Sequence, residues 1–163
     1  MIKEVRLREV IKDDLPIFFQ HQLEADAVEM AAHPPRDQEA FQTHWTEMLA
    51  KESVIKKTIL FDELVVGYVL SFVYFGQREV GYWIGKEYWG QGIATRALSE
   101  FLDQVRLRPL VASVAKHNRG SLRVLEKCGF RIVGEDKEFS NVGGNVVEGI
   151  VLKLERMDGA AKP

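Results

Sequence analysis

The sequence predicts a mixed α/β domain, a central sheet with both parallel and antiparallel neighbours and with helices on both faces. Its 163 residues are enough for one core, and 46% apolar with 28% charged residues is typical of a globular protein. Stretches with strand-like patterns also alternate with stretches of helical period along the chain. This order of elements indicates layers of helices packed on one sheet.

The first half of the chain is expected to hold one strand, two helices and a pair of strands. Alternating apolar residues indicate the first strand, and aspartates that can cap helices precede two amphipathic stretches. The expected elements are a strand at 5–10, a helix from Asp13 or Asp14 that residues 31–35 break, a second helix capped by Asp37 with Phe41, Trp45, Met48 and Leu49 inward, and strands at 54–61 and 64–75.

The second half is expected to begin with a strand at 79–85 and a helix at 92–106, whose apolar residues recur every three or four positions. Pro109 ends that segment before a strand at 110–115. A short helix from Asn118 to residue 127, a Gly129 C-cap, and strands at 130–135 and 146–154 around a turn at 141–145 complete the order. We expect one domain over residues 1–157 and a disordered tail over 158–163.

Composition narrows the classes of function. A net charge of −2 gives no electrostatic basis for binding nucleic acid or membranes, and no apolar run approaches the roughly 20 residues of a membrane span. The charged N-terminus is unlike a signal peptide, and the single Cys128 fits a reducing compartment, so a cytoplasmic location is expected. The four histidines lack metal-ligand spacing, so no metal is expected.

The stretch from Glu79 to Leu98 reads as a strand, a glycine turn and the start of a helix. Such a turn exposes backbone N–H groups and favours a bound anion, which indicates a phosphate carrier. A Walker loop is excluded, because no Lys-Ser or Lys-Thr follows Gly92. A dinucleotide fold fits poorly, since Thr95 occupies the sixth motif position and Lys116, rather than an acid, ends the next strand.

Two blocks of sequence resemble the GNAT superfamily of acetyl-CoA-dependent N-acetyltransferases, and within it the ribosomal-protein-alanine acetyltransferase (RimJ/RimL-like) branch. The first block is Tyr88-Trp-Gly-Gln-Gly-Ile-Ala-Thr-Arg-Ala-Leu98, which resembles the pyrophosphate loop of that branch. The second is Asn118-Arg-Gly-Ser-Leu-Arg-Val-Leu-Glu-Lys-Cys-Gly-Phe130. Trp89 departs from the Arg or Gln usual in the superfamily, a change that leaves the backbone donors of the loop in place.

This resemblance implies the GNAT fold, a seven-stranded mixed sheet that splays between its fourth and fifth strands, and it implies acetyl-CoA as cosubstrate. The pyrophosphate would lie on backbone amides of the loop and helix start, and the pantetheine arm would add to the fourth strand. The implied cofactor-binding residues are Gly90, Gln91, Gly92, Ile93, Ala94 and Thr95 in the loop, Trp83, Ile84 and Gly85 on the strand, and Asn118 and Ser121. Without a ligand, Asn118 and Ser121 would read as ordinary helix caps.

The resemblance also implies direct acetyl transfer in a ternary complex. Glu79 would be the general base that helps deprotonate the amine, or else a strand-end carboxylate beside Arg78. Many relatives carry a tyrosine as general acid where this chain has Leu125, which leaves Ser121 as the candidate proton donor.

The acceptor is expected between residues 24–37 and 136–145, where acidic side chains would suit an amine. The resemblance favours a protein N-terminal α-amine, possibly ribosomal. Two alternatives stay open, a small amine such as a polyamine, amino acid or antibiotic, and a non-catalytic acyl-CoA-binding sensor. The sequence also leaves open whether the protein forms a homodimer.

Overall fold

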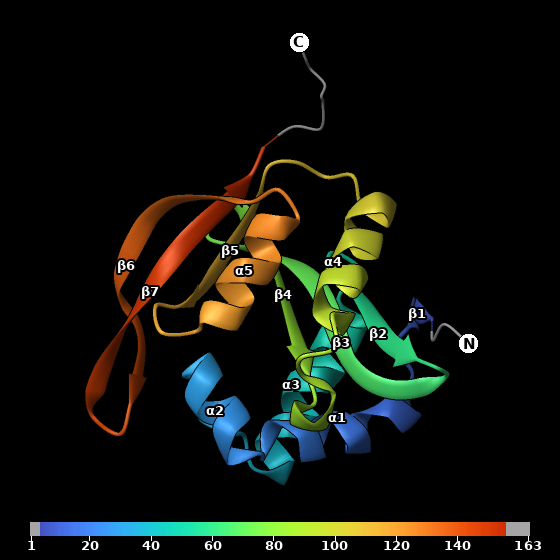
Figure 1. Ribbon diagram of the computed structural model, residues 1–163. Helices are drawn as coiled ribbons and strands as arrows, with labels where there is room; N and C mark the ends of the chain where they lie inside the picture. The colour runs from blue at the N-terminus through green and yellow to red at the C-terminus, as the bar shows by residue number, and fades with distance from the viewer. Residues whose placement is uncertain (1–3, 156–163) are drawn as a thin grey trace.

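The computed structural model describes residues 4–155, which form one seven-stranded sheet with helices on both faces (Figure 1). The strand order is β1-β2-β3-β4-β5-β7-β6. Only β4 and β5 are parallel neighbours, and every other pair is antiparallel. The strands are β1 (Val5–Glu9), β2 (Ile55–Phe61), β3 (Leu64–Tyr74), β4 (Gln77–Ile84), β5 (Leu110–Ala115), β6 (Arg131–Val142) and β7 (Asn145–Leu154). The predicted seven-stranded mixed sheet is confirmed.

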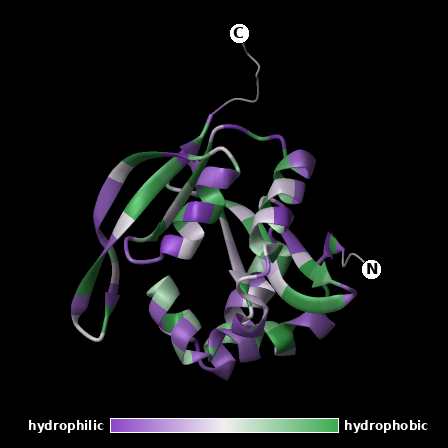
Figure 2. Ribbon diagram, in the orientation of Figure 1, coloured by the Kyte–Doolittle hydropathy of each residue, from purple (hydrophilic) through white to green (hydrophobic). Residues whose placement is uncertain are grey.

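Two apolar clusters lie on opposite faces of the sheet. On one face α4 and α5 pack against the strands through buried residues that include Leu98, Phe101 and Leu125. On the other, α1 and α3 pack Phe18 and Trp45 against β3. Figure 2 shows hydrophilic residues on the outer side of α4 and α5 and hydrophobic stretches along β3 and β7. The helices are α1 (Leu15–Gln22), α2 (Ala25–Ala31), α3 (Gln38–Ala50), α4 (Ile93–Gln104) and α5 (Arg119–Lys127), with 3-10 turns η1 (Lys12–Asp14) and η2 (Lys86–Tyr88).

The single helix expected from Asp13 or Asp14 to about residue 30 is wrong, because the chain forms two helices there. The first, α1, ends at Gln22, and Glu24 then begins α2 by accepting hydrogen bonds from the Asp26 and Ala27 backbone amides. A glutamate is an uncommon N-cap, so the sequence pattern did not reveal this break.

Asp14 also differs from the prediction, since its side chain does not cap α1. It is buried and accepts hydrogen bonds from the Arg8 guanidinium at 2.8 and 2.9 Å, the Thr58 hydroxyl at 2.6 Å and the Ile11 amide at 3.0 Å. Burial alone would raise the pKa of Asp14, but these donors outweigh it and hold the pKa below its usual value. The network fastens the start of α1 to β1 and β2.

The sixth strand is longer than the predicted 130–135. It pairs with β7 from Arg131 to Val142, through two irregularities in register. The irregularities interrupt the alternation of apolar and polar residues. A search for alternating residues in the sequence therefore does not detect the full strand. The expected acceptor segment 136–145 is therefore mostly strand.

Strands β4 and β5 separate as they run forward. Their register contains one pair, Glu79 with Val111, so the edges beyond it toward Ile84 are unpaired with each other. This is the predicted splay. Among residues 4–155 no helix is long and apolar enough to cross a membrane, and no group of three potential metal ligands gathers. The expected tail at 158–163 lies outside the described residues.

Candidate functional site

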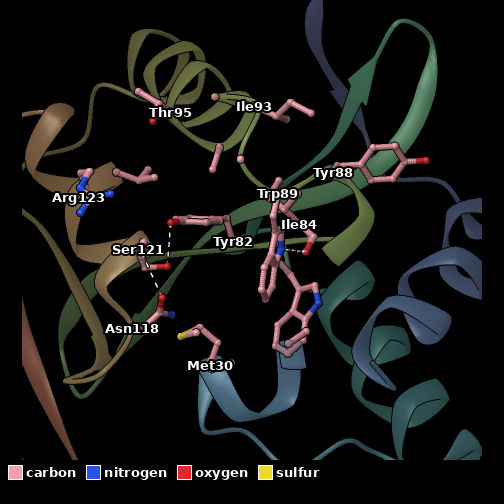
Figure 3. Close-up of a pocket in the computed structure, with 18 of the residues that line it drawn as sticks. Met30, Tyr82, Ile84, Tyr88, Trp89, Ile93, Thr95, Asn118, Ser121 and Arg123 are labelled. Atoms are coloured by element: carbon pink, nitrogen blue, oxygen red, sulfur yellow. Dashed lines mark hydrogen bonds between the residues drawn. The ribbon is translucent and has the colours of Figure 1, made fainter. Parts of the chain in front are cut away.

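A cavity of about 500 Å³ opens where β4 and β5 separate (Figure 3). Its wall comes from the end of β4, the loop before α4, the first turn of α4, one face of α5 and one side of α2. Of the predicted site residues it gathers Trp83, Ile84, Gly90, Gly92, Ile93, Ala94, Thr95, Asn118 and Ser121. The two sequence blocks therefore meet in one cavity, as expected.

The loop before α4 is shaped by Gly90 and Gly92, which both have φ of +77°. A Cβ at either glycine would meet no atom within 4 Å. Glycine is therefore favoured here by the left-handed backbone conformation and not by a lack of space for a side chain. The Trp89 indole Nε1 donates to the Ile84 carbonyl at 2.9 Å and joins this loop to the end of β4 (Figure 3). Trp89, the departure from the superfamily pattern, thus positions the loop.

The N-terminus of α4 points donors at the cavity. Its N-cap, Gly92, has no side chain to accept from the first turn, and the first backbone bond of the helix is from the Arg96 amide to the Gly92 carbonyl. The amides of residues 93–95 are left for a ligand or water. No acidic residue lies in this turn, so the helix dipole favours an anion there.

Two cationic side chains, Arg123 and Lys127 of α5, complete the positive side of the cavity wall. Lys116, which follows β5, faces Glu148 and Glu135 at 3.6 and 3.9 Å.

The unpaired edge of β4 presents the main-chain groups of Tyr82 and the amide of Ile84, whose carbonyl already accepts from Trp89. The Gly85 amide donates to the Val66 carbonyl of β3 at 2.9 Å, and hydrogen-bonding direction alternates along a strand. The main chains of Trp83 and Gly85 therefore face β3, while those of Tyr82 and Ile84 face β5. The backbone direction therefore favours Tyr82 and Ile84 over the expected Trp83 and Gly85 for main-chain contacts to a ligand, and these contacts stay a prediction.

A hydroxyl pair spans the cavity between β4 and α5. The Tyr82 hydroxyl donates to Ser121 Oγ at 2.9 Å, and the Ser121 amide donates to Asn118 Oδ1 at 3.2 Å (Figure 3). Asn118 is thus the N-cap of α5, and its cap bond fixes the turn that carries Ser121. Because Ser121 Oγ accepts from Tyr82, its own hydrogen is free to be donated into the cavity.

Tyr82 is not among the site residues predicted from the sequence. The only signal was its place on β4, where the strand edge opens. Burial raises the pKa of Tyr82 to about 12, so the phenol stays protonated at neutral pH.

Several predicted residues do not line the cavity, namely Glu79, Gln91 and Gly85. Glu79 lies at the closed end of the β4–β5 junction, three residues before Tyr82, which places it roughly 10 Å farther along the strand. Burial raises the pKa of Glu79. Its role as general base stays a prediction. Leu125, at the position of the usual tyrosine, is buried in the core.

Helix α2 forms the opposite wall and is held by contacts to three parts of the chain. Asp26 pairs with Lys86, His117 Nε2 lies 2.8 Å from the Glu29 carbonyl, and the Ser140 hydroxyl donates to the Ala32 carbonyl at 2.5 Å. Two of the acidic residues expected to attract an amine, Glu24 and Asp26, are therefore engaged in capping and pairing.

A second, smaller cavity of about 70 Å³ lies on the other side of β4, between α1, α3 and residues 33–36. Trp83 contributes to the wall of both cavities. Its indole Nε1 is buried and has no hydrogen-bond partner among the described residues.

Comparison with known sequences gives the family. Residues 4–131 match the family model described as Acetyltransferase (GNAT) domain. The chain is 25% identical over 89 residues to an uncharacterized N-acetyltransferase p20 of Bacillus licheniformis, covering 52% of this chain and 50% of that protein. It is 35% identical over 69 residues to a probable N-acetyltransferase YjcK of Bacillus subtilis (strain 168), covering 40% and 38%. The chain thus matches half or less of the length of these relatives.

Solved structures share the fold across nearly the whole chain. Spermidine N-acetyltransferase from Vibrio cholerae, in complex with CoA and spermine, has a TM-score of 0.82 at 17% identity, covering 93% of this chain and 95% of that one. RimJ from Mycobacterium smegmatis, in complex with CoA-disulfide, has 0.77 at 24%, covering 93% and 81%. A RimL ribosomal L7/L12 alpha-N-protein acetyltransferase in complex with coenzyme A has 0.81 at 17%, covering 93% and 94%. By its domain match and its fold, this chain belongs to the GNAT acetyltransferase family.

Proposed function

We propose that this protein is an acetyl-CoA-dependent N-acetyltransferase that acetylates a primary amine by direct transfer in a ternary complex. The observation that carries the proposal is one cavity that holds an uncapped helix N-terminus, an unpaired strand edge and the Tyr82–Ser121 hydroxyl pair. These three features match the pyrophosphate, the pantetheine amides and the thioester sulfur of one ligand.

Acetyl-CoA would bind mainly through backbone groups. Its pyrophosphate would accept from amides in the segment from Gly90 to Thr95, with Arg123 and Lys127 supplying charge nearby. Its pantetheine arm would pair with the exposed main chain of Tyr82, as an added strand does. The apolar side of α2, with Met30, would cover the arm (Figure 3).

In the reaction, the acceptor nitrogen attacks the thioester carbonyl, the C–N bond forms and the C–S bond breaks. The Ile84 amide, on the unpaired edge, would stabilise the oxyanion. Ser121 would protonate the leaving thiolate and be reprotonated from Tyr82, and Tyr82 would regain its proton from the water that takes one from the amine. The nitrogen loses its proton to water, because neither cavity has a carboxylate in its wall and Glu79 could act only through a chain of waters.

Membership of the family does not determine the class of acceptor. A protein N-terminal α-amine is our first candidate, since RimJ and RimL share the fold. A small-molecule amine is the second, supported by the equally similar spermidine N-acetyltransferase.

The experiment is thiol release from acetyl-CoA with a panel of amines and N-terminal peptides, beside acetyl-CoA binding by calorimetry. Binding with turnover on one acceptor class is the expected result. Binding without turnover on any amine would favour an acyl-CoA sensor, and no binding would overturn the assignment of the cavity.

A further inference from the structure

We propose that the second cavity is an acceptor subsite that binds a carboxylate, so that the substrates are primary amines carrying a carboxylate group. This rests on the proposed function and names the substrate class of the same site. The carboxylate could belong to a free amino acid or to an acidic side chain near a peptide N-terminus. The observation behind it is a cavity with an unpaired arginine and several hydrogen-bond donors but no acid.

The position of the second cavity suits an acceptor. It is separated from the first cavity by Trp83, whose neighbour Ile84 lines the expected thioester site. An acceptor anchored in the second cavity would therefore need to extend past one side chain to reach the acetyl group.

Arg36 gives the second cavity its charge. No described residue within 4–155 forms an ion pair with its guanidinium, and no Asp or Glu lines the cavity. The guanidinium lies close enough to Tyr68 and His44 to act on both. For Tyr68, burial raises the pKa and the charge of Arg36 partly offsets that rise. For His44, burial and the charge of Arg36 both lower the pKa. Burial, as the larger cause, brings the pKa of His44 to about 4, so this histidine is neutral at pH 7.

The backbone of Arg36 is held in place before any ligand binds. The Gln22 side chain donates to the Arg36 carbonyl at 2.9 Å and accepts from the Arg36 amide at 2.8 Å. Both residues line the cavity. This pair of bonds ties the segment before α3 to α1 and fixes the backbone from which the arginine side chain extends, so less chain has to be ordered when an anion binds.

Other donors in the wall suit a carboxylate. Tyr68 contributes a hydroxyl, and Trp83 has the indole N–H without an acceptor. A carboxylate has two oxygens and about four acceptor sites, so it can pair with the arginine and a neutral donor together. The remaining walls are aromatic and favour a short apolar chain beside the acid, with Phe18, Phe41 and Trp45.

A cationic acceptor fits the described residues less well. Its expected partners Glu24 and Asp26 are engaged elsewhere, and Arg36 would repel a second positive charge in this cavity. Two of the acids that suggested an amine-bearing acceptor are thus held in structural contacts.

The test compares amines that differ only in a carboxylate. Matched pairs are β-alanine with ethylamine, γ-aminobutyrate with propylamine, L-methionine with its decarboxylated amine, and N-terminal peptides with aspartate or asparagine in second place. For the pair that fits, we expect the acid to have a kcat/KM at least about tenfold higher. In Arg36→Met the preference should disappear through a higher KM for the acid, while Arg36→Lys keeps part of it. Arg131→Met, an exposed arginine on β6, is the matched control.

A binding measurement keeps the inference testable if no amine is turned over. Butyrate, which has no amine, should shift the Trp83 indole N–H signal in NMR, with the signal assigned through Trp83→Phe, and should not do so in Arg36→Met. Turnover without preference for any acid, an unchanged preference in a folded Arg36→Met, or no butyrate shift would overturn the inference. Failure of the proposed function looks different, since butyrate would still bind while acetyl-CoA bound without turnover or not at all.

Discussion

The two cavities on either side of Trp83 are built in different ways. The larger one is made of backbone amides, glycines and helix starts from two short stretches of sequence, residues 82–95 and 118–127, with only α2 added from elsewhere. The smaller one is made of side chains that come from α1, α3, the loop between α2 and α3, and two strands. A site that binds an invariant cosubstrate can rely on backbone geometry, whereas a site that selects an acceptor depends on side chains.

The largest effect is expected at the network that fastens α1, the helix that supplies Phe18 and Gln22 to the second cavity. Asp14→Ala leaves the Arg8 guanidinium and the Thr58 hydroxyl without their acceptor, so the free energy of unfolding should fall by about 3 kcal/mol. Because the pKa of Asp14 is lower in the folded than in the unfolded state, its contribution is present at neutral pH and is lost as pH falls through the folded pKa. Urea unfolding at several pH values measures both effects. A variant as stable as wild type and with the same acid limb would contradict the network.

In the first cavity, Ser121→Ala should lower kcat by about a hundredfold and leave the Kd of acetyl-CoA unchanged. The substitution removes the proton donor but keeps the amide that Asn118 caps. Steady-state kinetics with calorimetry measures the two effects. Ser99→Ala, on the exposed side of α4, is the control, and equal kcat values in the two variants would remove Ser121 from the chemistry.

The backbone character of the first cavity can be tested with two glycines of equal conformation. Gly92 has φ of +77° and Gly76, in the β3–β4 turn, has +76°, and neither has an atom near its missing Cβ. Substitution by alanine should cost each about 1 to 2 kcal/mol of stability. Only Gly92→Ala should weaken acetyl-CoA binding, by about tenfold, because relief of its strain shifts the amides of α4. Equal affinity in both variants would contradict a backbone-built site.

Tyr82→Phe should have a smaller effect, lowering kcat by roughly threefold to tenfold, since Ser121 keeps its proton but loses the donor behind it. With its pKa raised to about 12 by burial, Tyr82 should cause no inflection in the kcat–pH profile of the wild type below about pH 10. If the wild type has an inflection in its kcat–pH profile near neutral pH and Tyr82→Phe lacks it, Tyr82 titrates there, which would contradict a neutral phenol.

The smallest effect is expected at Glu79. Its carboxyl lies in the wall of neither cavity, so Glu79→Gln should change kcat by less than about threefold. A loss of a hundredfold or more, with acetyl-CoA binding intact, would instead establish Glu79 as the general base through ordered water.

The difference between the cavities also explains what the sequence could predict. Gly90, Gly92, Asn118 and Ser121 act within short local motifs, and local motifs are visible in a single sequence. Tyr82 meets Ser121 across 39 positions and Gln22 fixes Arg36 across 14, and these pairings exist only once the sheet and helices have packed. The sequence shows the charge of Glu24 and Asp26 but not that a helix cap and a lysine already engage them.

The most direct test of whether both cavities are filled at once combines two measurements. Initial velocities are measured over a grid of acetyl-CoA and acceptor concentrations. The intact mass of the protein is measured after exposure to acetyl-CoA alone. Intersecting reciprocal plots and an unmodified protein are the predicted result. Parallel plots with a stoichiometrically acetylated protein would mean a covalent acetyl-enzyme, and would contradict direct transfer between the two cavities.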